Sequence, residues 1–263
     1  MGSHGDRIEP GSLRRRGTVD YMRMAGRRSN VHGLVELDVT EARRAIKAIE
    51  SDTGEQLSFT AFLVSCLGEA IEDHPHVNAY RDWRGRRHVF DDVDVNVLVE
   101  TAIHGERIGV PHVLRGINER SLRTIHEEIR GAQRTTDPTG LTRLSTLAFR
   151  LPGVVRRQIW RLPQWFPGRW RSMAGTVAVT SVGMFGEGGG WAISPTNYTV
   201  QLTVGGISRK PRFVDDDLTE REILHLTVTV DHDVVDGAAA ARFVQRLGEL
   251  IESGHGLPAR ERD

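Results

Sequence analysis

Apolar and polar residues alternate along several stretches of the chain, as they do in strands that bury one face. The clearest stretch is LTVTVDHDVVDG (226–237), in which leucine and valine alternate with threonine until the pattern stops at Asp231. We expect the extended run at 108–116 to be broken by Pro111. The same two-residue period predicts further strands at 32–39, 87–90, 92–101, 176–183 and 198–207.

Other stretches repeat their apolar residues every three or four positions, which is typical of helices with one buried side. Residues 40–51 follow this spacing, with Ala42, Ile46 and Ile49 on one face. Helices are also predicted at 58–73, at 121–133 with Ser121 as the N-cap, and at 238–253. Two helices, several strands, a helix and then mostly strands indicate an α+β layered fold, not repeated βαβ units.

Composition narrows the function classes. The 263 residues suffice for one large domain or two small ones, and 35 basic residues balance 35 acidic ones. This balance argues against nucleic acid as a partner, and we do not expect membrane contact. Cys66 is the only cysteine, lies in an apolar helical run, and is expected to be buried and unreactive. The start of the chain has no apolar segment of the kind that directs secretion, so we expect a cytoplasmic protein whose residues 1–13 are mobile.

The histidine at the end of the clearest strand has two interpretations. A carboxylate that precedes a run of alanines is a common helix N-cap, so Asp236 could be purely structural, and His232 could be a hydrogen-bonded turn residue. Alternatively, an imidazole with an ordinary pKa of about 6.5 is mostly neutral near pH 7 and can accept a proton. A strand end would hold such a base more firmly than a loop would.

The segment DHDVVDG (231–237) resembles the His-x-x-x-Asp-Gly motif of the acyltransferases of 2-oxo acid dehydrogenase complexes, within the chloramphenicol acetyltransferase-like superfamily. VTSVGMFGEGGGWAISP is similar to the family's Ser/Thr-containing strand and Gly-rich turn, and GERIGVPHVLRGINERSL to its Gly-x-x-x-Pro-x-x-x-Arg segment. LVELDVT and HPHVNAY stand in the expected order. The resemblance implies that residues 14–263 form the catalytic domain, a two-layer α/β sandwich with a mixed sheet.

The resemblance also implies roles for individual residues. His232 would be the general base, and the Thr180 hydroxyl would donate to the oxyanion of a tetrahedral intermediate. Asp236 would be structural and paired with an arginine near the N-terminus, best matched by Arg16, with Arg14 and Arg15 as close alternatives. Members of this family form homotrimers with active sites between subunits, so we expect a trimer here.

The expected reaction moves an acyl group between coenzyme A (CoA) and a thiol, hydroxyl or amine acceptor. The thiol could be a dihydrolipoyl group on another protein, because we find no lipoyl domain in this chain. Asp233 stands where the family usually has arginine, Ser181 replaces the commoner asparagine, and the C-terminus is charged. Asp233 and the missing lipoyl domain leave open a non-catalytic trimeric scaffold with the same fold. The charged C-terminus, where complex-forming relatives end in an apolar anchor, indicates a trimer that does not assemble further. Chloramphenicol-type acetylation is a weaker alternative, because Pro111 and Arg115 follow the complex-forming branch.

Residues 137–172 form an insertion that the family does not predict. Positions 143–171 contain seven arginines, three tryptophans and no acidic residue. Arg156, Arg157 and Trp160 could bind the phosphates and adenine of CoA. The alternatives are a surface lid, or an interfacial helix that touches lipid or a partner. The glycines of GEGGGW are expected to form a turn, and the histidines of DHPHV have the wrong spacing for a metal site, so no metal is predicted.

Overall fold

The computed structural model describes residues 13–103, 106–134, 151–181 and 188–258. The segment predicted to be mobile, the first part of the insertion and the last five residues fall wholly or mostly outside these ranges. Every α-helix predicted from the apolar spacing is present, and its bounds differ from the prediction by only a few residues. The helices of the described ranges are α1 (Leu13–Ala25), α2 (Thr40–Thr53), α3 (Phe59–Asp73), α4 (Leu122–Arg134), α6 (Gly153–Ile159), α7 (Leu162–Trp165), α8 (Pro167–Ala174) and α9 (Gly237–Glu252), with short 3-10 turns η1 (Pro75–Val77) and η2 (Ile117–Glu119).

A mixed six-stranded sheet forms one layer of the fold. The strands are β1 (Asn30–Asp38), β8 (Asp217–Asp231), β7 (Val200–Val214), β6 (Val177–Ser181), β4 (Val95–Ile103) and β5 (Glu106–Leu114), in that spatial order. The pairs β4–β6 and β6–β7 are parallel, and the other neighbours are antiparallel. The expected α+β sandwich with a mixed sheet is therefore confirmed.

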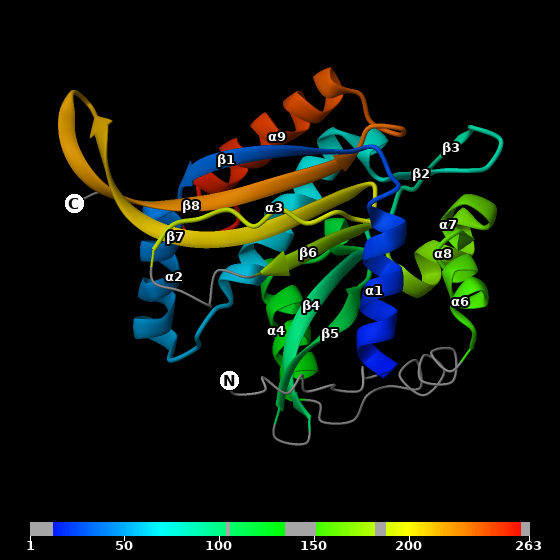
Figure 1. Ribbon diagram of the computed structural model, residues 1–263. Coiled ribbons are helices and arrows are strands. Elements are labelled where there is room, and N and C mark those ends of the chain that lie inside the picture. Colours follow the sequence, from blue (N-terminus) through cyan, green and yellow to red (C-terminus); the bar gives the residue numbers. More distant parts are fainter. Residues whose placement is uncertain (1–12, 104–105, 135–150, 182–187, 259–263) are drawn as a thin grey trace, which may run out of the picture.

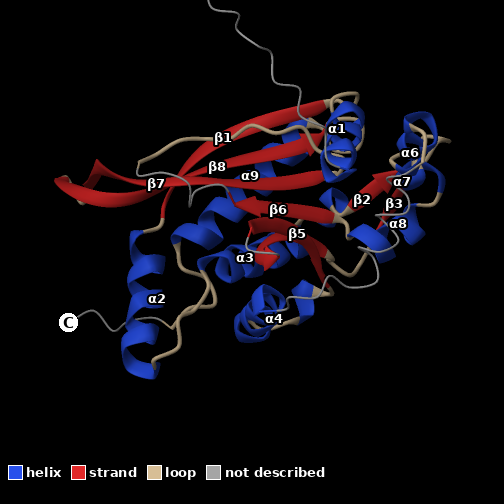
Figure 2. Ribbon diagram, turned by 60° about the horizontal axis from the view of Figure 1, so that its bottom comes forward, coloured by secondary structure: helices blue, strands red, loops and turns tan. Residues whose placement is uncertain are grey.

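Helices α3, α4 and α9 pack behind the sheet in Figure 1, and α1 crosses in front of it. Figure 2 shows the same helical layer beneath the strands, with α6, α7 and α8 gathered beside the small hairpin of β2 (Ala79–Arg81) and β3 (Arg87–Val89). Leucines and valines of β7 and β8 form one core cluster with α3 and α9. Cys66 belongs to this cluster and is fully buried, so the prediction of a buried thiol is confirmed.

The alternating pattern of β8 predicted a strand with one buried face, but the structure buries both faces. Leu226 and Val228 point into the core, and Thr227 and Thr229 on the opposite face are also fully buried. The chain before β7 lies against this second face: Trp191 packs edge-on against His225, with ring centroids 4.5 Å apart. The chain before β7 therefore covers the face of β8 that the sequence pattern predicted to be exposed.

Pro111 does not break the strand in which it lies. The ladder of β5 with β4 runs without interruption from Glu106 to Leu114, and Leu98 pairs with Pro111. Proline is tolerated here because β5 is an edge strand of the sheet, where its missing N–H leaves no partner unsatisfied. The predicted break was therefore wrong, and the predicted extended run was right.

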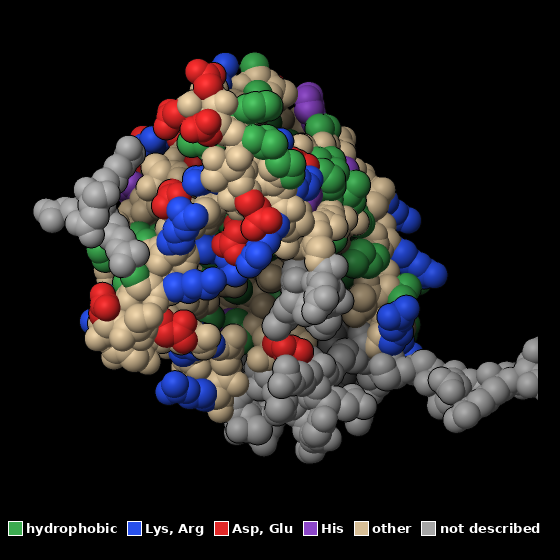
Figure 3. Space-filling view, turned by 90° about the vertical axis from the view of Figure 1, so that its left-hand side faces the viewer, with side chains coloured by type: hydrophobic (Ala, Val, Ile, Leu, Met, Phe, Trp, Pro, Cys, Tyr) green, Lys and Arg blue, Asp and Glu red, His purple; other side chains and the backbone are tan. Residues whose placement is uncertain are grey.

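Strands β7 and β8 extend well beyond the sheet as a long hairpin, on the left of Figure 1. The turn at its tip places Asp215 and Asp216 at positive φ values of 49° and 69°. Viewed from that end, basic and acidic side chains lie intermixed over the surface (Figure 3). This intermixing is in keeping with the balanced composition. Ion pairs between β1, β7 and β8 include Lys210–Glu36, Arg212–Glu36 and Arg221–Asp38, and Arg221–Glu41 and Arg43–Glu222 join α2 to β8.

Candidate active site

His232 is the first residue after β8, and its side chain is exposed at the start of the turn that leads into α9. The turn is fixed by its backbone: the N–H groups of Val234 and Val235 both donate to the Asp231 carbonyl at 3.0 Å. Both valines are buried, at 5% and 2% exposure. The backbone of the turn is thus anchored in the core, and the imidazole is exposed to solvent.

Asp236 is the N-cap of α9, as the sequence predicted. Its carboxylate accepts the Ala239 backbone N–H at 2.8 Å. This hydrogen bond is the main cause that lowers the pKa of Asp236, with further contributions from the Ala238 N–H, Arg242 and His232, against the opposing effect of desolvation. Asp236 therefore fixes the start of the helix and interacts electrostatically with the candidate base.

Within the described residues, Arg16 does not form the expected ion pair with Asp236. Arg16 and Asp236 are both exposed, and the ion pairs of the described residues do not join them. Instead, Arg28, which follows α1, lies 3.3 Å from the carboxylate of Asp231, directly before the histidine. The sequence contained no signal for this contact, because the alternation of β8 places Asp231 on the threonine face, which was expected to be exposed, and only the structure shows that Asp231 is buried.

Asp233, the residue that departs from the family pattern, is held by the same segment. Its Oδ1 accepts the Ser29 hydroxyl at 3.1 Å, and its backbone N–H donates to Asp231 Oδ1 at 3.2 Å. The carboxylate at this position therefore has a defined hydrogen-bond partner in the chain before β1.

Thr180 lies near the end of β6 and is partly buried. It shares the sheet face of Ala178, opposite to Val177 and Val179, which belong to the core. Thr180 pairs with Thr203 of β7, and Thr203 pairs with Thr227 of β8, five residues before the histidine. With strand dimensions of about 3.3 Å per residue and about 4.8 Å per strand, Thr180 and His232 are separated by roughly 16 Å along the sheet and roughly 10 Å across it.

The three residues assigned to CoA in the sequence prediction pack against α1. Arg156 Nε lies 2.7 Å from Asp20, whose side chain is 4% exposed, and Arg157 lies 4.0 Å from the same carboxylate. The ring of Trp160 packs edge-on against Tyr21 at 5.1 Å and against Trp170 at 5.8 Å. This part of the insertion thus covers α1, as a lid that packs on the body would do.

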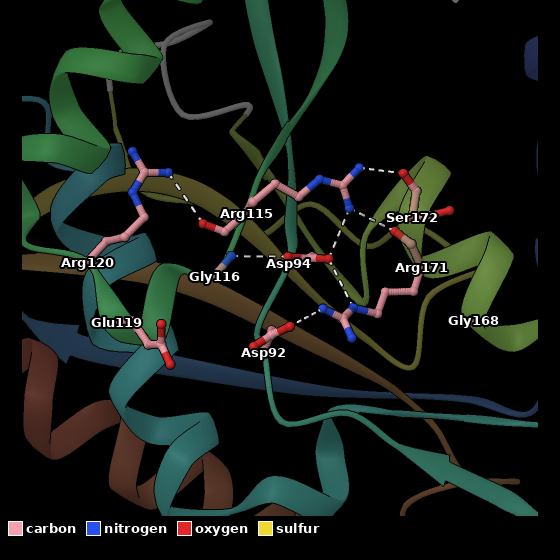
Figure 4. Close-up of a pocket in the computed structure, with 9 residues that line it drawn as sticks. All are labelled: Asp92, Asp94, Arg115, Gly116, Glu119, Arg120, Gly168, Arg171 and Ser172. Carbon is pink, nitrogen blue, oxygen red and sulfur yellow. Dashed lines mark hydrogen bonds and ion pairs between the residues drawn. The ribbon is translucent and has the colours of Figure 1, made fainter.

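A cavity of about 640 Å³ lies between α8, β4 and η2 (Figure 4). Two arginines from different elements converge there on Asp94: Arg115 Nη1 at 2.9 Å and Arg171 Nε at 3.1 Å, and Arg171 also pairs with Asp92. Sequence reasoning quoted Arg115 but missed its partners. These charges compensate one another, so the cluster fastens the insertion to the sheet and leaves no unpaired cation for a phosphate group.

Within the described ranges, no group of three or more His, Cys, Asp or Glu side chains is arranged to hold a metal ion. Likewise, the helices of these ranges are too short or too polar to cross a lipid bilayer.

Comparisons with a family model and with curated proteins agree on one family. The family model of the 2-oxoacid dehydrogenases acyltransferase (catalytic domain) matches residues 4–143 and 172–257. The stretch between these matches falls within the Arg/Trp-rich insertion. The chain is 25% identical over 225 residues to the lipoamide acyltransferase component of the branched-chain alpha-keto acid dehydrogenase complex of Bacillus subtilis (strain 168). This match covers 84% of the chain but only 46% of the relative, so the chain spans about half of that protein's length.

Solved structures show the same fold. A probable dihydrolipoamide acetyltransferase from Listeria monocytogenes 4b F2365 matches with a TM-score of 0.69 at 21% identity, covering 95% of this chain and 96% of that one. A chloramphenicol acetyltransferase matches with a TM-score of 0.51 at 14% identity, covering 94% and 98% of the two chains. These matches show that the chain shares the fold of both proteins.

Proposed function

This chain belongs to the family of 2-oxoacid dehydrogenase acyltransferase catalytic domains, and from that premise we propose that it transfers an acyl group between CoA and a thiol acceptor. The observation that carries the proposal is the exposed imidazole of His232 on a turn whose backbone is anchored in the core. Hydroxyl and amine acceptors would use the same base. The scaffold alternative has less support, because a structural histidine in this turn would be expected to contact the protein.

The proposed reaction is a general-base acyl transfer. His232 takes the proton from the acceptor thiol, whose ordinary pKa of about 8.5 leaves it mostly protonated at pH 7. The thiolate attacks the thioester carbonyl and forms a tetrahedral oxyanion, to which the Thr180 hydroxyl donates a hydrogen bond. Collapse breaks the carbon–sulfur bond to CoA, and the departing CoA thiolate recovers the proton from His232.

We propose further that each active site lies between two subunits of a homotrimer. Within one chain Thr180 and His232 are too far apart to contact the same reacting carbon. A second copy can bring its Thr180 to the exposed histidine of the first. Closed cyclic symmetry then repeats the site at every interface of the trimer.

The acceptor is proposed to be a dihydrolipoyl group presented by a separate protein in the cytoplasm. The single buried thiol, Cys66, is compatible with a reducing compartment. CoA contacts of Arg156, Arg157 and Trp160 stay a prediction that competes with their packing on Asp20 and Tyr21. Direct measurement of CoA affinity in variants of these residues would separate the two roles.

The test is turnover of acetyl-CoA and longer acyl-CoA thioesters with dihydrolipoamide as acceptor, followed by release of free CoA. We expect activity in the native protein and a loss of at least about 10²-fold in His232→Ala. The oligomeric state of the variant, measured by light scattering, is the control. Native protein that folds and assembles but turns over no thioester would favour the scaffold.

A further inference from the structure

The turn that carries His232 is fastened to residues 28 and 29, which lie between α1 and β1. The first pair of the β1–β8 ladder joins Asn30 to Asp231, so the chain before Asn30 continues alongside the turn. There the Ser29 carbonyl accepts the backbone N–H of His232 at 2.8 Å. The turn is thus an extension of the sheet edge, and the histidine occupies the position opposite Ser29.

Side chains reinforce this backbone contact on both sides of the histidine. Arg28 lies 3.3 Å from the Asp231 carboxylate on one side, and the Ser29 hydroxyl donates to Asp233 at 3.1 Å on the other. Arg28 also donates to the Asn197 carbonyl at 2.6 Å, so its guanidinium joins the turn to the segment before β7. Arg28 and Ser29 thus contact His232 itself, through its backbone N–H, and the residues on both sides of it, Asp231 and Asp233.

The ion pair is largely withdrawn from solvent. The Asp231 side chain is 3% exposed and that of Arg28 is 14% exposed. Burial raises the pKa of Asp231, and Arg28 counteracts this by favouring the charged carboxylate. Removing either partner of a buried pair leaves the other uncompensated, so the geometry of the turn depends on both.

We infer that Arg28, Asp231 and Ser29 are positioning residues that hold His232 in its reactive orientation. The inference rests on the proposed function, because it concerns the base of that reaction. Asp236 does not supply this restraint, since it caps α9 four residues later. Because a misplacement of about 1 Å can cost about 10² in rate, loosening the turn lowers kcat while acyl-CoA still binds.

The experiment compares Asp231→Asn, Arg28→Met and Arg28→Lys with the native trimer in the acyl-CoA assay. For the first two we expect kcat to fall about 10- to 100-fold and the KM for acyl-CoA to change less than about 2-fold. Arg28→Lys restores part of kcat, because an ammonium can still pair with Asp231. Arg27→Met is the matched control, since the neighbouring Arg27 is exposed, and it keeps native kinetics.

The outcomes separate this inference from the proposed function. Native activity that is lost in His232→Ala, together with native kcat in a folded Asp231→Asn trimer, overturns the positioning role and leaves the acyltransferase standing. Absence of activity in the native protein overturns the proposed function itself. If Asp231→Asn does not fold, the Arg28 variants decide, and kcat equal to native in Arg28→Met overturns the inference.

Discussion

Thr180 and His232 lie on one sheet but cannot act on the same atom within one chain. The ladder places Thr180 level with Thr227, two strands away, and His232 follows Thr227 by five residues, just past the end of β8. Both side chains have at least partial access to solvent. A site that uses both therefore requires a second copy of the chain, and this requirement shapes the predictions below.

The hydroxyl of Thr180 is predicted to act in the transition state. Thr180→Val keeps the shape and removes the donor, so turnover should fall about 10²–10³-fold with little change in KM. Thr180→Ser keeps the donor and should retain most of the activity. Steady-state kinetics of the two variants checks this, and equal rates for valine and serine would remove the oxyanion role.

Arg156 is predicted to contribute stability more than CoA affinity. Its removal leaves the buried Asp20 carboxylate with Arg157 at 4.0 Å as its remaining cationic partner, so Arg156→Met should lower the free energy of unfolding by about 3 kcal/mol, the low end for a broken buried pair. Urea denaturation measures this, and Arg169→Met, at an exposed residue, is the control. A large rise in the KM for CoA with unchanged stability would instead support the CoA-binding prediction.

Cys66 is predicted to be inert in the native protein. Burial raises the pKa of its thiol to about 12, so almost no thiolate exists at pH 8. An aromatic disulfide reagent should react with it only in denaturant, or slowly as the helix opens. Rapid reaction of one thiol per native chain at pH 8 would contradict the buried placement.

Asp236 is predicted to stabilise the fold more strongly in its charged form than in its protonated form. Because its pKa is lowered in the folded state, its contribution is complete above the ordinary aspartate pKa and is lost as the pH falls through the folded value. The stability deficit of Asp236→Ala relative to native protein should therefore shrink between about pH 5 and pH 3. Asp236→Asn, which retains a capping side chain, serves as the control, with a smaller deficit at pH 7. A deficit of Asp236→Ala that does not change with pH would contradict this.

The sequence predicted the elements whose signals are local. The alternation of β8, the apolar spacing of α3 and the cap at Asp236 all appear in the structure as expected. Helix α1 was missed because it has no apolar stripe and packs instead through Asp20 and Tyr21 on the insertion. Its contacts depend on residues far along the chain, which local periodicity does not contain.

In the candidate site too, the sequence predicted what local motifs determine and missed what contacts between distant residues determine. His232 and Thr180 could be named from their motif, since each stands at a recognisable strand end. The arginine that contacts the histidine turn could not be named from the sequence. Arg16 fitted the spacing expected for a partner of Asp236, but the turn is contacted by Arg28, through Asp231. Helix α1 ends at Ala25, and the chain reaches the turn only just before β1. Packing of the folded chain decides which arginine pairs with a distant carboxylate. The outer half of the β7–β8 hairpin was not predicted either, because the strand expected at 198–207 ends before it.

Subunit complementation tests the central claim most directly. His232→Ala and Thr180→Val chains, coexpressed and purified as mixed trimers, should regain about a third of native activity, because every mixed trimer places an intact His232 beside an intact Thr180 at one of its three interfaces. Each variant alone should stay at its own low rate. Mixed trimers that show no more activity than the two variants separately would contradict an active site shared between subunits.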